Sequence, residues 1–266
     1  MADQVLVSAD RNNIEECIDL ALDFGIGIEL MTFAYPDVLD GNWKQTVSTY
    51  NAILRPVRAP VTLHGPFMDL VSGSPDELIN HLCAQRYQHA IYIASELGIK
   101  VVNLHANFIG SLHNSSYRRG WHERNITFWS ALADLAHTNG VTIVLENMWE
   151  YEPSIIGDVL REVNHPSLKA CLDVGHARVF GDKHHTIADW INHLAPWLIH
   201  THLNNNNGVI DEHHGFDWEN GVINYHEVLP LFRKLKESPY FCLEMWDVKD
   251  MRQSLPYFEL DKMPEG

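Results

Sequence analysis

The sequence predicts a single-domain α/β protein, a (β/α)8 TIM barrel that spans residues 1–266. Apolar strand-like runs and amphipathic helical segments alternate along the chain, which implies a parallel sheet joined by right-handed crossovers. The strand-like runs are continuously apolar, as expected when both faces of a sheet are buried. The length of 266 residues is close to the about 250 that such a barrel typically needs.

Eight strands and seven helices are expected in alternation. The strands are expected at 4–8, 26–31, 60–64, 99–105, 141–146, 169–173, 197–203 and 240–244. The helices are expected at 12–24, 42–54, 75–97, 122–138, 154–164, 185–195 and 225–237. Gly25, Gly98 and Gly140 follow three of the helices, where a left-handed residue commonly ends a helix. The helix at 75–97 opens with SPDE at 74–77, a capping-box pattern with the serine as cap.

Polar groups stand at the ends of six of these strands. The segments are VTLHG at His64, VVNLHA at His105, VLENM at Glu146, CLDVGH at Asp173, IHTHLN at His202 and FCLEM at Glu244. One end of a parallel barrel collects such residues when it holds an active site. A doubly wound open sheet is the alternative architecture, but it would bind ligand at a switch point and would not draw polar residues from six strands.

Four of these residues form a candidate metal site. Unpaired carboxylates and imidazoles at the ends of buried strands are costly to desolvate, and a shared cation removes that cost. Glu146, Asp173, His202 and Glu244 supply mixed nitrogen and oxygen ligands, a set suited to a divalent metal such as zinc or manganese. We therefore expect one divalent metal ion at this site.

Composition restricts the partners and the compartment. The net charge is −16, from 35 acidic and 19 basic residues, which disfavours nucleic acid and anionic membranes as partners. The start MADQVLVSADRNN has no signal-peptide pattern, and no apolar run approaches the about 20 residues of a membrane span. We expect a cytoplasmic protein that could form homo-oligomers.

The barrel interior below the candidate site is expected to hold cysteine and histidine. Cys171 and Cys242 each precede a candidate ligand by two residues, so they should point into the barrel one layer below it, as small core residues. His200 precedes His202 by two residues, and we expect it to be hydrogen-bonded inside the barrel.

The motifs resemble those of the xylose-isomerase-like barrel superfamily, which includes sugar epimerases and endonuclease-IV-type repair enzymes. The resemblance covers about residues 26 to 246 and lies in HGP at 64–66, NLHA at 103–106, LEN at 145–147, LDVGHA at 172–177, HLN at 202–204, DEH at 211–213 and LEM at 243–245. It implies that Glu146, Asp173, His202 and Glu244 bind the metal shared by the superfamily. In the three-metal zinc nucleases of this superfamily, the residues that match His64, His105, His176, Asp211 and His213 hold two further metals. The resemblance therefore implies that these five residues bind further metals, up to three in all, or substrate.

Aromatic and basic residues in the loops are candidates for substrate binding. Phe108, Trp149 and Trp246 could pack against a sugar ring or carbon chain, although loop packing is an equally good interpretation. Arg118 could bind a substrate phosphate, although a solvated position near a helix is the simpler interpretation.

Three functions are compatible with these residues. The first is a metal-dependent isomerase or epimerase of a sugar or sugar phosphate, in which Glu146 and Glu244 transfer protons through a metal-stabilised enediolate. The second is a zinc phosphodiesterase of the endonuclease IV type acting on abasic DNA. The third is a non-catalytic metal-binding barrel. The acidic surface and the aromatic loops favour the first.

Overall fold

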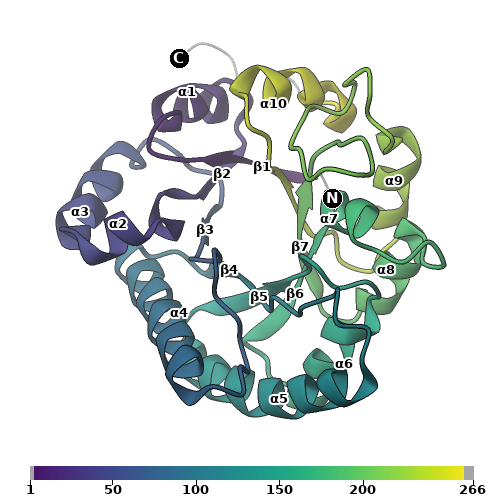
Figure 1. Ribbon diagram of the computed structural model, residues 1–266. Helices are drawn as coiled ribbons and strands as arrows, with labels where there is room; N and C mark the ends of the chain where they lie inside the picture. The colour runs from purple at the N-terminus through teal and green to yellow at the C-terminus, as the bar shows by residue number, and fades with distance from the viewer. Residues whose placement is uncertain (1–2, 261–266) are drawn as a thin grey trace.

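The computed structural model describes residues 3–260, which form one closed barrel of eight parallel strands. The strands lie at the centre of the molecule and the helices surround them (Figure 1). The strands are β1 (Gln4–Ala9), β2 (Gly27–Leu30), β3 (Val61–His64), β4 (Val101–His105), β5 (Thr142–Glu146), β6 (Leu168–Asp173), β7 (Leu198–Leu203) and β8 (Tyr240–Leu243). The predicted TIM barrel is confirmed.

Strand pairing brings the predicted site residues to one rim. Each strand pairs in parallel with the next, and β1 also pairs with β8, which closes the barrel. His105 lies opposite Glu146 across β4 and β5, and Asp173 lies opposite His202 across β6 and β7. Because the strands are parallel, these residues share the carboxyl-terminal mouth of the barrel.

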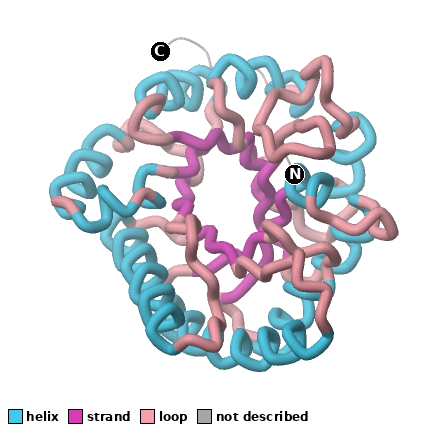
Figure 2. Tube along the Cα trace, in the orientation of Figure 1, coloured by secondary structure: helices cyan, strands magenta, loops and turns pink. Residues whose placement is uncertain are grey.

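The helices form the outer layer, as Figure 2 shows. They are α1 (Ile14–Phe24), α2 (Pro36–Asp40), α3 (Trp43–Ile53), α4 (Glu77–Leu97), α5 (Ser115–Thr138), α6 (Ser154–Val163), α7 (Val174–Val179), α8 (Ile187–Leu194), α9 (Tyr225–Phe232) and α10 (Val248–Ser254), with short 3-10 helices η1 (Thr32–Ala34) and η2 (Leu255–Phe258). Among the helices within residues 3–260, none is both long and apolar enough to cross a membrane.

Glycine allows the predicted turns from helix to strand. Gly25, Gly98 and Gly140 all have positive φ, at 65°, 72° and 66°. A residue with a side chain is strained in this region, so glycine lets each helix end sharply and the next strand begin.

The start of α4 differs from the prediction. The helix begins at Glu77, and the Asp76 side chain caps it by accepting hydrogen bonds from the backbone N–H groups of Leu78 and Ile79. Ser74 Oγ instead accepts a hydrogen bond from Asp76 N at 3.1 Å. The predicted serine cap is wrong: the helix starts two residues later than expected, so Asp76 takes the cap position and Ser74 lies outside the helix.

Other differences from the prediction involve helices beside the barrel mouth. The helix predicted at 122–138 begins seven residues earlier, since Asn114 caps it by accepting from Ser116 N and Tyr117 N. The short helices α2, α7 and α10 are additions to the predicted set. Of these, α7 matters most for function, because Asp173 caps it at the end of β6.

Candidate metal and active site

The barrel mouth gathers the polar residues that the sequence places at strand ends. His64, His105, Glu146 and Asp173 are the last residues of β3, β4, β5 and β6, and Glu244 directly follows β8. Glu146 and Asp173 are completely buried, and Glu244 is only 7% exposed. Such burial of acidic groups is costly unless opposite charges or hydrogen bonds compensate it.

Glu146 is the centre of this cluster. Its Oε2 lies 2.9 Å from His105 Nε2 and 3.6 Å from His64 Nε2. Its Oε1 lies 3.1 Å from His202 Nδ1 and 3.3 Å from His176 Nδ1. Burial opposes ionisation of Glu146, but His105 and His202 outweigh it and hold the pKa of the carboxyl well below its usual value.

Glu244 stands on the other side of His202. Its Oε2 lies 3.3 Å from His202 Nδ1 and 3.4 Å from His213 Nδ1, and its Oε1 lies 4.0 Å from His64 Nε2. Although buried, Oε2 accepts no hydrogen bond. A buried carboxylate oxygen without a partner, beside an imidazole nitrogen, is suited to bind a cation.

Asp173 is both the last residue of β6 and the cap of α7. Its Oδ1 accepts a hydrogen bond from His176 N at 2.6 Å, which caps α7, and its Oδ2 accepts one from Asn204 Nδ2 at 3.1 Å. Burial raises the pKa of Asp173 to about 6, with Glu146 and Glu244 acting in the same direction and His176 opposing. The side-chain contacts of Asp173 in the described chain are with His176 and Asn204, and none is with an arginine or lysine.

A second acidic group lies nearer the solvent. Asp211 Oδ2 lies 3.4 Å from His176 Nε2, and Asp211 Oδ1 lies 3.4 Å from His213 Nε2. Burial opposes ionisation, but the two histidines lower the pKa of Asp211 below its usual value. His176, which follows β6, thus lies next to Asp211 and His213, which follow β7.

Asn205 fixes the loop that carries Asp211 and His213. Its Nδ2 donates to Phe216 O at 2.9 Å and to Ile223 O at 3.1 Å, while its Oδ1 accepts from Ile223 N at 3.0 Å. Asn205 also pairs with His214 through backbone hydrogen bonds in both directions. One buried amide therefore joins both ends of the loop between residues 206 and 222.

Sequence reasoning missed Glu29, a completely buried residue of β2. Its Oε1 lies 2.6 Å from His202 Nε2, its Oε2 lies 2.7 Å from His200 Nε2, and Thr62 donates to Oε2 at 2.7 Å. The carboxylate holds the far nitrogen of His202, which leaves Nδ1 facing Glu146 and Glu244. Carboxylates orient metal-binding histidines in this way.

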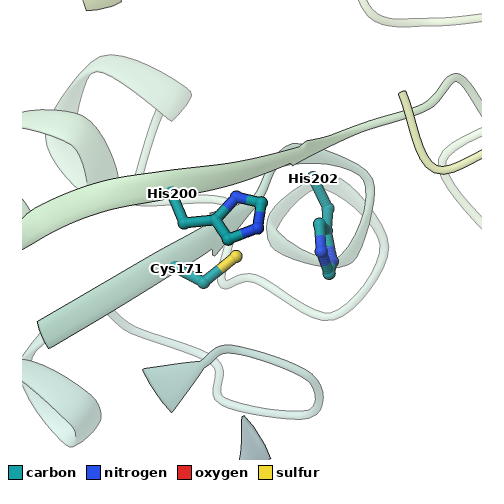
Figure 3. A group of neighbouring side chains, drawn as sticks. All are labelled: Cys171, His200 and His202. Atoms are coloured by element: carbon teal, nitrogen blue, oxygen red, sulfur yellow. The ribbon is translucent and has the colours of Figure 1, made fainter. Parts of the chain in front are cut away.

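The layer below the mouth holds cysteine and histidine, as predicted. Cys171 lies opposite His200 in the pairing of β6 with β7, and Figure 3 shows their side chains next to each other, with His202 further along β7. Cys171 and Cys242 are completely buried, and Cys242 Sγ lies 3.8 Å from Glu29 Oε1. The expected hydrogen bond of His200 inside the barrel is confirmed by its contact with Glu29.

The site favours positive charge. Burial alone would lower the pKa of His213, but Glu244 and Asp211 raise it to about 9. Burial likewise opposes protonation of His202, yet the surrounding carboxylates raise its pKa well above its usual value. Protons or a divalent cation can supply the charge that these carboxylates require.

The geometry of the side chains fits a metal ion. Several groups place one ligand atom from each residue within 4.8 Å of the others, including His64 with His202 and Glu244, His64 with His105 and Glu146, and His176 with Asp211 and His213. Imidazole and carboxylate ligands of this kind could hold zinc or manganese.

A cavity of about 400 Å³ opens above the cluster. Its lining includes His64, His105, His176, Asp211, His213 and Glu244. Trp246 also lines it and is 63% exposed, so its predicted contact with substrate stays a prediction. Glu146 lies beneath these residues and does not line the cavity surface.

Three of the predicted substrate contacts lie elsewhere. Phe108 is completely buried and packs edge-on against Trp121, with ring centroids 5.2 Å apart. Arg118 binds Glu152 at 2.5 Å, and Trp149 is 36% exposed; neither lines the cavity. The ring of Phe108 thus packs beneath the loops, which is the alternative given in the sequence analysis, and its contact with substrate stays a prediction.

The structure is a closed eight-stranded barrel with buried histidines and carboxylates at its mouth. Proteins of this class can bind a metal ion at that end of the barrel. The chain belongs to the xylose isomerase-like TIM barrel family, which matches residues 18–260. Among sequence relatives, the uncharacterized protein MJ1311 of Methanocaldococcus jannaschii is 29% identical over 208 residues, 76% of this chain and 69% of the relative.

Solved structures show the same fold. A D-tagatose 3-epimerase-like protein is 23% identical, with a TM-score of 0.81 over 96% of this chain and 97% of that one. The TTHB071 protein from Thermus thermophilus, in a crystal soaked with ZnCl2, is 24% identical, with a TM-score of 0.77 over 96% of each chain. A D-psicose 3-epimerase in the presence of D-fructose is 14% identical, with a TM-score of 0.73 over 96% of this chain and 97% of the other.

Proposed function

We propose that the protein is a metal-dependent isomerase or epimerase of a sugar, which acts by proton transfer beside a carbonyl group. The main support is the position of two carboxylates, Glu146 and Glu244, which both lie within 3.3 Å of the same nitrogen, His202 Nδ1. Two acid/base groups this close can serve the same substrate carbon.

The two carboxylates have different surroundings, which suits different roles. Glu244 lines the cavity and has an oxygen without a hydrogen-bond partner, so it can reach a substrate directly. Glu146 lies deeper among four histidines, which hold it ionised. We assign proton transfer to both residues, with Glu244 as the group nearer the solvent.

The proposed metal ligands are Glu146, Asp173, His202 and Glu244. A bound divalent cation would supply Lewis-acid stabilisation of the negative charge that develops on the substrate oxygen. The protein's own contribution is to orient His202 through Glu29 and to hold Asp173 at the start of α7. The epimerase names of several structural neighbours support this assignment.

Proton exchange tests the proposal. The metal-loaded protein is incubated in D2O with a panel of ketoses, and loss of carbon-bound hydrogen is followed by NMR. We expect exchange with the wild type, and a loss of about 100-fold or more with Glu146→Gln or Glu244→Gln. Glu212→Gln is the matched control, since this loop residue neither lines the cavity nor contacts the cluster.

The result is interpreted together with metal content. Full exchange by either glutamine variant at wild-type metal content would remove that residue from proton transfer. Loss of both metal and exchange would show that the residue acts mainly as a ligand.

A zinc phosphodiesterase is the second candidate, because all nine residues of the three-metal pattern are buried or partly buried in one cluster. Six of them form two of the groups with ligand atoms within 4.8 Å: His64, His105, Glu146, His176, Asp211 and His213. Metal analysis discriminates the two functions. About three zinc ions per chain with cleavage of abasic duplex DNA would establish the phosphodiesterase, whereas full zinc loading without cleavage would reject it.

A further inference from the structure

The charges around the cavity bear on the substrate that it can accept. The described lining includes the acidic residues Asp10, Asp211 and Glu244 but no lysine or arginine. Its four histidines, His64, His105, His176 and His213, already contact Glu146, Asp211 or Glu244. Enzymes that bind phosphorylated sugars need hydrogen-bond donors or cations for the phosphate group, because an uncompensated dianion is costly to bury. The part of the cavity next to β1 therefore lacks the usual means of binding phosphate.

Arg11, next to Asp10 in the sequence, and Arg118, the candidate phosphate ligand, are already paired. Arg11 Nη1 lies 2.5 Å from Asp37 Oδ2, with its guanidinium 5.0 Å from the centre of the Tyr35 ring. On the other side, Arg118 binds Glu152 and donates to Ser154 Oγ at 2.7 Å. Neither side chain lines the cavity.

The turn before α1 already holds a carboxylate of the protein itself. Backbone N–H groups before a helix commonly bind phosphate. Here Asp10 Oδ1 accepts from Asn12 N at 2.7 Å and from Asn13 N at 3.3 Å, and Asn13 Oδ1 accepts from Asp10 N at 2.8 Å. The Asp10 carboxylate thus takes up the N–H groups of Asn12 and Asn13 and adds a negative charge to the cavity.

The remaining wall suits a neutral carbohydrate. Apolar lining comes from Met31, Met148 and Met245, with Phe67 and Trp246. Aromatic rings pack against the C–H faces of sugars, and methionine side chains adapt to varied shapes. The acidic and amide side chains at the β1 end accept and donate hydrogen bonds to hydroxyl groups.

We infer that the substrate is an uncharged polyhydroxy ketone or aldehyde, and that Asp10 discriminates against its phosphorylated form. This inference rests on the proposed sugar isomerase or epimerase function and defines its substrate class. A single divalent cation would carry two charges against the three proposed carboxylate ligands Glu146, Asp173 and Glu244. The neighbouring histidines already contact these carboxylates and Asp211, so their charge is also committed before a phosphate dianion arrives.

Matched substrates test the inference. The metal-loaded wild type is assayed for proton exchange with ketopentoses and ketohexoses and with their terminal phosphates. We expect kcat/KM for the best neutral ketose to exceed that for its phosphate by at least about 10-fold, since like charges in one site cost affinity. Asp10→Asn should shrink this ratio several-fold, because asparagine keeps the acceptor for Asn12 and Asn13 without the charge.

Asp134→Asn is the matched control: it makes the same chemical change on the outer surface of α5 and should leave the ratio unchanged. A purely structural role of Asp10 would lower both rates together and leave the ratio constant, which would overturn its role in discrimination. Equal or faster exchange of the phosphate would overturn the inference and leave the proposed function standing. Exchange with neither series would overturn the proposed function, and this inference with it.

Discussion

Replacing Glu29 by glutamine should weaken both the barrel and its metal site. The carboxylate contacts three donors, His202 at 2.6 Å, His200 at 2.7 Å and Thr62 at 2.7 Å. Glutamine has nearly the same shape but only one acceptor oxygen, so at least one histidine N–H would face an amide NH2. Breaking a buried charged contact of this kind costs about 3–5 kcal/mol in the free energy of unfolding.

The loss should extend to metal affinity, because the Glu29 carboxylate orients His202. Removing a carboxylate behind a metal-binding histidine typically weakens metal binding about 10–100-fold. Chemical denaturation of the metal-free protein measures the first effect, and titration of zinc or manganese against a competing chelator measures the second.

Thr62→Val is the control for Glu29→Gln. It removes a donor to the same carboxylate without touching either histidine, so we expect a loss of about 1 kcal/mol in stability and a metal affinity near that of the wild type. Wild-type metal affinity in Glu29→Gln would refute the idea that this carboxylate orients a ligand.

Three further predictions concern residues around the mouth. Burial raises the pKa of Glu150 from 4.5 to about 6, so its contribution to stability is complete below pH 4.5 and is lost as the pH rises through 6; the change is about 2 kcal/mol. Chemical denaturation at pH 4.5 and pH 7 measures the free energy of unfolding. Between these two pH values it should fall less in Glu150→Gln than in the wild type, by this amount. Phe108→Ala should lower the free energy of unfolding by about 3–5 kcal/mol, while the KM for the substrate stays near the wild-type value. A large rise in KM would show instead that Phe108 contacts the substrate. Gly175→Ala should destabilise by about 1–3 kcal/mol, because its Cβ would stand 2.0 Å from Asn204 Oδ1; thermal unfolding at the wild-type temperature would show that Asn204 can move aside.

The strand ends were predictable because two simple rules apply to them. Parallel strands place their carboxyl ends at one mouth, and polar residues ending apolar runs must find partners there. His64, His105 and Glu146 illustrate this, since each is the last residue of its strand and all three lie within hydrogen-bonding distance of a neighbour in the group.

Other features depend on contacts that local patterns do not show. Glu29 lies in the middle of a buried strand, and its partners are about 170 residues away, at His200 and His202. A charged residue inside an apolar run was the available signal. The position of Phe108 after a strand end predicts a contact with the cavity, but the chain turns its ring inward against Trp121.

The loop that follows Asn205 is held at several points. Asn205 bonds to Phe216 and Ile223, and residues 213–216 bond to Trp246, Asp250 and Ser254. Because Asn205 ties the start of the segment to Ile223 at its end, and residues 213–216 are tied to the chain after β8, the ends keep their separation when residues between these contacts change. A relative with a different sequence in this segment, including the positions of Asp211 and His213, could therefore bind a different ligand at the mouth while its strands stay the same.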